Sequence, residues 1–430
     1  MALVGGRMKK KILLKAPVLT RSGYGEHSRF ILQALRSREE LFDIHIIPLN
    51  WGQTSWIIES HEDREWIDNR ILQTSKYINQ FNSEPSNQGK TPFDISLQVT
   101  IPNEWERLAA VNIGVTAGIE TTKVAPAWIE KAKIMDKIIV PSKHSRSIYN
   151  NTAYNATYTE TNETTIFKND TEISVVPYSA RKYKPANIDL DFDSEFNFFT
   201  VSQWSPRKNI ENTIKWFIEE FYDNPNVGLV VKTNLAKNCL MDRELCFKRI
   251  EVLLSEYNER ECKIYLLHGH MSDEELAAVY THPKIKAFYT LTHGEGFGLP
   301  IFEAACQGLP VIAPAWSGQC DFLSAPSTSK NQKNKLRPHF LKVDYDLEMV
   351  PEGVVWEGVI EKESMWCNPR QGSAKMALRN MYKNHTRHQS AAKKLQKWVL
   401  KEFADKKLHE EFIKILEVED SNDSDDIVII

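Results

Sequence analysis

The sequence has few cysteines, no long apolar run and no excess of either charge. Its 6 cysteines include no CxxC pair, which argues against a zinc site and a disulfide framework and favours reduced thiols in the cytoplasm. No apolar run is long enough to span a bilayer and no secretory signal is recognisable, so we expect an intracellular protein without an integral membrane segment. With 54 Lys+Arg against 57 Asp+Glu, the balance does not favour a generic polyanion-binding protein.

Short apolar runs alternate with helical patterns along a chain of 430 residues, of which 42% are hydrophobic. The expected strands of the first half are 11–14, 45–49, 94–99, 111–116, 137–140 and 173–176, with helices at 26–36 and 127–135. The rhythm restarts after the acidic segment 187–195, with strands at 198–201, 228–232, 263–267, 287–291 and 310–313. Continuous apolar strands alternating with helices predict parallel sheets covered on both faces. We therefore expect two doubly wound lobes with a ligand cleft between them.

The most informative segment is 290–323, which begins as a strand and continues through a glycine-rich loop into a helix. The loop is 293–298, Pro300 falls in the first helical turn, and Gly308 ends the helix. Glycines allow a ligand to approach the backbone closely, and the start of a helix offers free N–H groups to a phosphate. The segment therefore predicts a binding site at the carboxyl edge of a sheet.

Two acidic residues in this segment, Glu295 and Glu303, are separated by seven residues. A carboxylate beside a phosphate is electrostatically unfavourable, so these side chains are better suited to accept hydrogen bonds from the hydroxyls of a sugar or ribose. The alternative is that Glu303 merely favours the first turn of a helix and that the glycines form a tight turn. The combination of both glutamates with the glycine loop favours the binding interpretation.

The segment resembles the signature of the retaining glycosyltransferases of the GT-B fold, in the glycosyltransferase group 4 family. That signature is Glu, seven residues, Glu, here with Gly-Phe-Gly-Leu-Pro at 296–300. The resemblance continues through 197–221, 268–280 and 366–378, and more weakly through 112–149. It implies an α/β GT-B fold, in which two Rossmann-like lobes face a central cleft. It also implies retaining transfer of a hexose or pentose from a nucleotide-diphosphate sugar, with no metal and no further cofactor.

The resemblance assigns the donor-binding residues. It places the ribose on Glu303, the donor sugar on Glu295 and the diphosphate on Lys208. The family usually has an arginine where this chain has Gln203, and the sequence leaves open whether Arg207 replaces it or points to solvent. The expected donor-binding set is Gly23, Gly25, Gln203, Arg207, Lys208, Gly294, Glu295, Gly296, Phe297, Gly298, Leu299 and Glu303.

The expected catalytic residues are Glu295, Lys208 and Glu120. Many relatives have a histidine near position 120, after strand 111–116, and here Glu120 is the candidate for a contact with the sugar or the acceptor. A helix-capping or solvated role for Glu120 is the alternative. The loop Ser22–Glu26 resembles the first-lobe loop that faces the donor phosphates, although a plain glycine turn explains it nearly as well.

The resemblance and the linker divide the chain into parts. We expect an acceptor-side domain at 1–190 with a hairpin-like insertion at about 150–172, a nucleotide-sugar-binding domain at 191–385, helices at 386–417 that pack back toward the first domain, and an acidic tail at 418–430. The segment 391–416 is expected to be one helix with a single apolar side.

Two sequence patterns superficially suggest metal ligands. Asp189, Asp191 and Asp193 alternate in the expected linker with no phosphate loop beside them, so we expect them to be solvated. His268 and His270 match a family loop at the cleft edge, for which structural roles are favoured over metal binding.

The sequence does not identify the donor nucleotide, the sugar or the acceptor, which could be a glycan, a lipid, a protein or a modified DNA base. Two alternative functions stay open: transfer to modified bases in DNA, for which the insertion would contact the acceptor, and sugar-nucleotide binding without catalysis. Peripheral membrane contact through the first lobe is also open. Loss of activity in Glu295→Ala would exclude the non-catalytic alternative.

Overall fold

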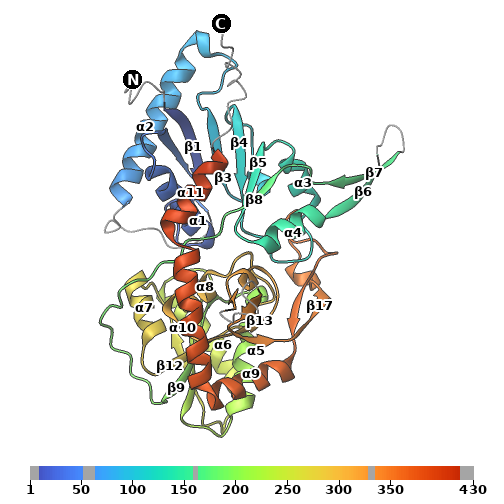
Figure 1. The fold of residues 1–430 in the computed structure, drawn as a ribbon. Coiled ribbons are helices and arrows are strands. Elements are labelled where there is room, and N and C mark those ends of the chain that lie inside the picture. The colour runs from blue at the N-terminus through green and yellow to red at the C-terminus, as the bar shows by residue number, and fades with distance from the viewer. Residues whose placement is uncertain (1–8, 52–62, 158–162, 328–334, 417–430) are drawn as a thin grey trace.

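A computed structural model describes residues 9–51, 63–157, 163–327 and 335–416. They form two α/β lobes, one above the other in Figure 1, with helices around each sheet. Each lobe is built on a six-stranded sheet of parallel strands. The predicted fold class, two doubly wound lobes, is confirmed.

The sheet of the first lobe has the strand order β2-β1-β3-β4-β5-β8. Its strands are β1 (Lys10–Ala16), β2 (Phe42–Pro48), β3 (Ile95–Val99), β4 (Val111–Val115), β5 (Lys137–Val140) and β8 (Ile173–Val175), and its helices are α1 (Gly23–Arg36), α2 (Arg64–Ser83), α3 (Pro126–Ala132) and α4 (Lys143–Asn151). Every residue of β3 is buried, as expected for a central strand covered on both faces. Helix α2 was not predicted, because it buries only Ile67 and Thr74 and so carries no strong apolar period.

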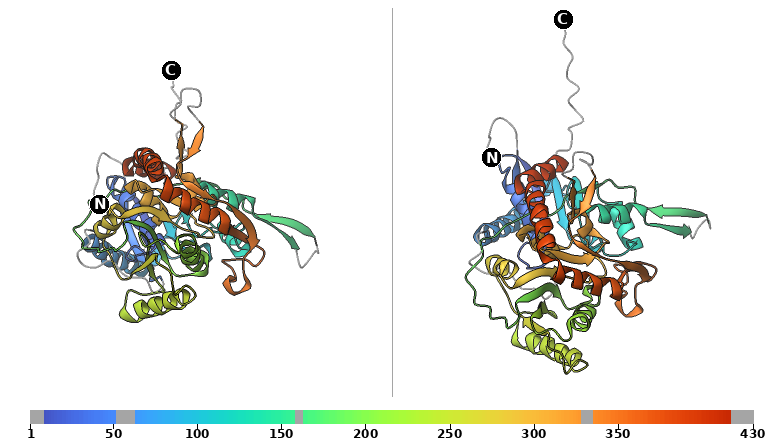
Figure 2. Two further views of the ribbon diagram at one scale, coloured as in Figure 1. Left: turned by 90° about the horizontal axis from the view of Figure 1, so that it is seen from below. Right: turned by 60° about the horizontal axis from the view of Figure 1, so that its bottom comes forward.

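An antiparallel hairpin interrupts the first lobe between α4 and β8, where the insertion was expected. Its strands are β6 (Ala153–Thr157) and β7 (Thr164–Lys168), and most of their side chains are exposed. The hairpin projects from the body of the protein in all three views of Figures 1 and 2. The ring of Phe167 lies under the ammonium of Lys133 and helps to attach the hairpin to the lobe.

The second sheet has the strand order β11-β10-β9-β12-β13-β16. Its strands are β9 (Phe196–Gln203), β10 (Val227–Asn234), β11 (Lys263–Leu267), β12 (Ile285–Tyr289), β13 (Val311–Pro314) and β16 (Leu341–Val343), and its helices are α5 (Ile210–Phe221), α6 (Leu240–Leu254), α7 (Asp273–Thr281), α8 (Leu299–Gln307) and α9 (Gln371–Lys383). The chain runs from β9 outward to β11 and then returns to β12 on the other side of β9. Ligands of open parallel sheets bind at such a switch point, beyond the carboxyl ends of the strands.

Part of the second lobe extends over the first. We call residues 345–369 the cross-lobe arm: strands β17 (Tyr345–Met349) and β18 (Met365–Pro369) pair antiparallel, and the segment between them reaches the first lobe. The amide of Thr122 donates to the Met365 carbonyl over 2.8 Å, and the Asn103 side chain donates to the Gly358 carbonyl over 3.0 Å. A second small antiparallel pair, β14 (Ser324–Pro326) with β15 (Leu336–Pro338), lies in the same lobe.

The C-terminal segment is two helices, and the prediction of one helix over 391–416 was wrong. Helix α10 (His385–Glu402) ends before the buried Phe403, whose backbone leaves the helical region, and α11 begins at Asp405 and runs to Leu416. Helix α10 packs on α8 of the second lobe, whereas α11 packs on α1 of the first. Because of this break, the apolar side chains of the C-terminal segment contact the second lobe from α10 and the first lobe from α11. The expected acidic tail, 418–430, lies outside the described residues.

The chain also passes between the lobes at residues 176–195, and this connection meets the C-terminal one. The amide of Ala180 donates to the Phe403 carbonyl over 2.7 Å. The two passages of the chain between the lobes are therefore hydrogen-bonded to each other.

Candidate active site

The loop between β12 and α8 places Glu295 at the carboxyl edge of the second sheet. Gly298, with φ of 96°, precedes the helix, and Gly308, with φ of 73°, ends it. Both φ values lie in the left-handed region that glycine adopts without strain. The Glu295 amide donates to the Ser317 hydroxyl over 3.0 Å, which fixes the loop against β13. The glycines therefore set the direction in which this loop enters the helix.

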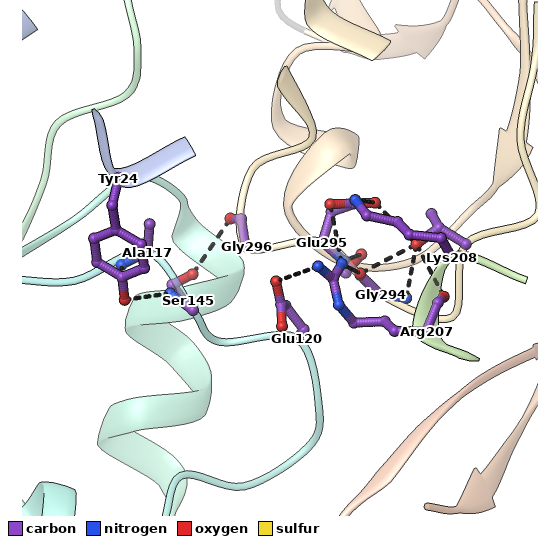
Figure 3. A network of polar contacts seen from close by, with 12 residues as sticks. Tyr24, Ala117, Glu120, Ser145, Arg207, Lys208, Gly294, Glu295 and Gly296 are labelled. Carbon is purple, nitrogen blue, oxygen red and sulfur yellow. Dashed lines mark hydrogen bonds and ion pairs between the residues drawn. The ribbon is translucent and has the colours of Figure 1, made fainter. Parts of the chain in front are cut away.

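Two cations meet the Glu295 carboxylate, as Figure 3 shows. The Lys208 ammonium lies 2.6 Å from one carboxylate oxygen, and the Arg207 guanidinium lies 3.2 Å from the other. Thr292 donates a further hydrogen bond over 2.9 Å. Burial acts to raise the pKa of Glu295, but the charges of Lys208 and Arg207 outweigh it and hold that pKa below its ordinary value. Glu295 is therefore an ionised, buried acceptor between two cations.

Arg207 also reaches across to the first lobe. Its guanidinium lies 2.9 Å from the Glu120 carboxylate and donates to the Gly294 carbonyl over 2.7 Å. The 3-10 turn Pro206–Lys208, which follows β9, aims both cations into this region. Gln203 is exposed, and its amide donates to the Leu235 carbonyl over 2.6 Å. Of the two orientations that the sequence left open for Arg207, the structure thus has the one that faces the cleft.

Glu120 lies between the lobes in a loop that Tyr24 holds in place. The Tyr24 hydroxyl is 2.8 Å from the Thr116 hydroxyl and accepts hydrogen bonds from the amides of Ala117 and Gly118. Burial raises the pKa of Glu120, while the Arg207 charge opposes that rise. Glu120 was expected at the site, whereas Tyr24 was not. The only signal for Tyr24 was its position between two glycines after the first strand.

The glycine-rich loop of the first lobe begins helix α1. The Ser22 hydroxyl accepts a hydrogen bond from the Gly25 amide over 3.1 Å and so caps the helix. A Cβ atom at Gly25 would lie 1.9 Å from the Thr20 carbonyl oxygen, whereas one at Gly23 would meet no atom within 4 Å. Gly25 is thus required by the turn itself, and Gly23 leaves open space beside the cleft.

Two glycines of the second lobe, Gly294 and Gly296, pack against the backbone of the first. A Cβ atom at Gly294 would lie 2.2 Å from the Glu120 carbonyl oxygen, and one at Gly296 would lie 1.8 Å from that of Ala117. The Ser145 hydroxyl also donates to the Gly296 carbonyl over 3.3 Å. We expected these glycines to admit a ligand. In this structure they admit the opposite lobe, so the two loops are in direct contact.

The remaining members of the donor-binding set lie on either side of this contact. Phe297 is buried and packs 4.9 Å from the Tyr178 ring, so it belongs to the core between the lobes. Leu299 and Glu303 line a cavity of about 110 Å³, to which Glu26 of the first lobe also contributes. The structure thus separates Glu303 from the Glu295 cluster while keeping both between the lobes.

Glu303 accepts a hydrogen bond from the Tyr280 hydroxyl over 3.0 Å. Burial raises the pKa of Glu303 to about 8, an effect that the Tyr280 hydrogen bond only partly offsets. Lys232, at the end of β10, faces the same carboxylate and was missed by sequence analysis. The sequence signal that was available for Lys232 is a charged residue near the end of an otherwise buried strand.

The two metal-like patterns of the sequence lie away from the Glu295 cluster. Asp189, Asp191 and Asp193 are exposed. Among the described residues, one group with potential metal ligands comprises His268, Asp242 and Cys246. The Asp242 carboxylate accepts hydrogen bonds from three backbone amides and lies 2.8 Å from the His268 ring. These bonds satisfy the carboxylate, and we assign the group a structural role in holding the loop after β10.

The fold is that of known GT-B proteins. Sucrose-phosphate synthase from Thermosynechococcus elongatus has a TM-score of 0.59 at 13% identity, and the match covers 95% of this chain and 98% of that one. A glycosyltransferase from Rickettsia africae gives 0.57 at 12% identity, covering 95% and 97%. HepE from Anabaena, in complex with UDP and glucose, gives 0.56 at 12% identity, covering 95% and 99%. At such low identities the likeness shows a shared fold and nothing more. It confirms the predicted GT-B architecture.

A curated relative matches over a shorter segment. The serotype-specific mannosyltransferase WbdA of Escherichia coli is 32% identical over 116 residues, which is 27% of this chain and 13% of the relative's length. No protein-family model matches the chain. In the part of the chain that the structure describes, no helix is both long and apolar enough to cross a membrane.

Proposed function

We propose that this GT-B protein is a retaining glycosyltransferase that moves a sugar from a nucleotide-diphosphate sugar to an acceptor. The observation that carries the proposal is the cluster of Lys208, Arg207 and Glu295 at the switch point of the second sheet, opposite Glu120 of the first lobe. Such a cluster can hold both an anionic diphosphate and the hydroxyls of a sugar. The likeness to glycosyltransferases in fold, and to a mannosyltransferase over one segment, supports the same reading.

In this mechanism the second lobe holds the donor at both ends. Glu303 accepts hydrogen bonds from the ribose hydroxyls, and Glu295 accepts them from the sugar. Lys208 and Arg207 bind the diphosphate, where negative charge develops as the bond between the anomeric carbon and the phosphate oxygen breaks. These side chains provide at the leaving group the positive charge that a divalent cation supplies in other enzymes, so the proposed reaction is metal-independent.

Transfer then forms a bond from the anomeric carbon to an acceptor oxygen on the face that the diphosphate leaves. The acceptor proton passes to the departing phosphate oxygen, so the reaction conserves protons and needs no nucleophile from the protein. Glu120, on the first-lobe side, would orient the sugar or the acceptor hydroxyl. The contact of the two loops at Gly294 and Gly296 keeps water from the reacting atoms, which limits hydrolysis of the donor.

The test begins with a thermal-shift panel of UDP, GDP, ADP and their sugars, including glucose and mannose. A true donor at saturating concentration is expected to stabilise the protein by roughly 2–4 kcal/mol. Transfer or slow hydrolysis of that donor is then measured in wild type and in Glu295→Ala. Stabilisation without turnover would instead support a sugar-nucleotide-binding protein, and no stabilisation by any member would contradict the proposal.

A further inference from the structure

We propose that Lys232 binds the phosphate of the donor that is joined directly to the ribose. This inference rests on the proposed function, because it concerns the same cleft. Lys232 is neither in the glycine-rich loop nor in the Pro206–Lys208 turn, and it belongs to a different strand, β10.

The position of Lys232 follows from the register of the second sheet. Lys232 pairs with Val201 of β9 on one side and with Leu267 of β11 on the other. It therefore lies near the carboxyl ends of three adjacent strands, at the edge where the β9 turn presents Lys208. A side chain at this edge can reach a ligand in the cleft.

The contacts of Lys232 place its charge on the ribose side of the cleft. Its ammonium donates to the Gly269 carbonyl over 2.9 Å. Electrostatically it faces the carboxylates of Glu303 and Glu275. If Glu303 holds the ribose hydroxyls, the first phosphate, which the CH₂–O group joins to the same ribose, is the nearest anionic group of the donor to Lys232.

Lys232 also differs from the other two cations in the partners of its charge. Arg207 and Lys208 are both ion-paired with carboxylates in this structure. In the described residues, the one hydrogen bond of the Lys232 ammonium goes to a neutral carbonyl, and none of the ion pairs includes it. Burial lowers the pKa of Lys232, while Glu275 and Glu303 oppose that effect. An anionic oxygen at this point would supply the missing partner.

A further reason lies in the residue that replaces the family's arginine. Gln203 pairs with Asn234, two residues beyond Lys232 on the neighbouring strand. The Gln203 side chain is exposed and carries no charge, so it cannot form a bidentate ion pair with a phosphate. Lys232 supplies a positive charge at the same edge of the sheet, on the strand next to Gln203, where the family's arginine charge is missing.

Calorimetry with three series of ligands separates the possible roles: uridine, UMP and UDP; guanosine, GMP and GDP; and adenosine, AMP and ADP. The variant Lys232→Gln removes the charge but keeps a donor for the Gly269 carbonyl. It is expected to lower the affinity for the mono- and diphosphates of whichever series binds by about 10- to 100-fold and to leave the affinity for the nucleoside unchanged. Lys232→Arg should retain most of the affinity. Lys215→Met on α5, which breaks an exposed pair with Glu256, serves as the charge-matched control.

Each outcome has one meaning. Equal weakening of the nucleoside and its phosphates in Lys232→Gln would assign Lys232 to the base or ribose and overturn the inference. Unchanged phosphate affinity would overturn it as well, while leaving the proposed function intact. If wild type binds none of the three series, the proposed function fails and this inference fails with it. Thermal unfolding of each variant without ligand shows whether the fold is retained.

Discussion

The guanidinium of Arg207 lies 2.9 Å from the carboxylate of Glu120, and the two residues belong to different lobes. The same guanidinium contacts Glu295, so one cation joins both carboxylates. A diphosphate that binds Arg207 must compete with these carboxylates. In the proposed mechanism, the donor phosphates therefore have to replace these carboxylates as partners of Arg207.

Replacing Glu120 by Gln is expected to tighten diphosphate binding and to slow transfer. Removal of one competing charge from Arg207 should lower the Kd of the cognate nucleoside diphosphate by roughly three- to tenfold, while the lost contact with sugar or acceptor reduces kcat. Calorimetry and steady-state kinetics measure the two effects. Glu130→Gln on the exposed side of α3 is the control, and a weaker Kd in Glu120→Gln would contradict the competition.

Lys208→Met is expected to reduce kcat/KM by about 10²- to 10³-fold, because it removes stabilisation of the leaving diphosphate. The fold should survive, since Arg207 still faces the Glu295 carboxylate. Kinetics with the donor found in the panel provide the measurement, with Lys215→Met as a matched surface control. Activity within threefold of wild type would remove Lys208 from the mechanism.

Nucleotide affinity is expected to rise with pH up to about 8 and then level off. Burial raises the pKa of Glu303 to about 8, so the free protein holds this proton at neutral pH, whereas ribose hydroxyls donate best to the ionised form. Kd values measured from pH 6.5 to 9 test this. The slope should vanish in Glu303→Gln. An affinity in wild type that falls with rising pH would exclude Glu303 as the ribose acceptor.

Acid is expected to destabilise the protein through His27. His27 is buried and has no hydrogen-bond partner among the described residues, and burial lowers its pKa to about 3. The folded state therefore binds fewer protons than the unfolded state below about pH 6.5. Stability should fall as the pH drops through this window, by up to about 1.4 kcal/mol per pH unit for one proton. Chemical denaturation should show that the unfolding free energy of His27→Leu falls less steeply with decreasing pH than that of wild type. A residual slope is expected from His144, whose pKa burial lowers to about 4. An unchanged slope in His27→Leu would refute the assignment.

Gly296→Ala is expected to separate the two loops at the lobe contact. Its Cβ atom would lie 1.8 Å from the Ala117 carbonyl oxygen, a backbone atom that cannot turn aside as a side chain would. We expect a loss of about 1–3 kcal/mol in unfolding free energy or an increased radius of gyration in X-ray scattering. Gly372→Ala on α9, where a Cβ atom meets nothing within 4 Å, is the control. A variant as compact and stable as wild type would show that the contact is not tight.

Features that depend on the local sequence pattern were predictable from the sequence. Apolar runs of strand length predicted the parallel strands. The family resemblance assigned Glu295 to the donor sugar and Lys208 to the diphosphate, and the structure brings these two side chains to 2.6 Å. The orientation of Arg207 was not predictable, because it depends on Glu120, a residue far along the chain in another lobe. The cross-lobe arm was missed for a similar reason: β17 is largely exposed and lacks the apolar run by which buried strands are recognised. Long-range contacts therefore decided most of what the sequence left open.

The hydrogen bond between Ala180 and Phe403 has a mechanical consequence. Both covalent connections between the lobes pass this point, so we expect the lobes to open by rotating about it rather than by moving apart. The hydrogen bonds between Thr122 and Met365 join the lobes away from these two connections in the chain, so such a rotation would be expected to break them first.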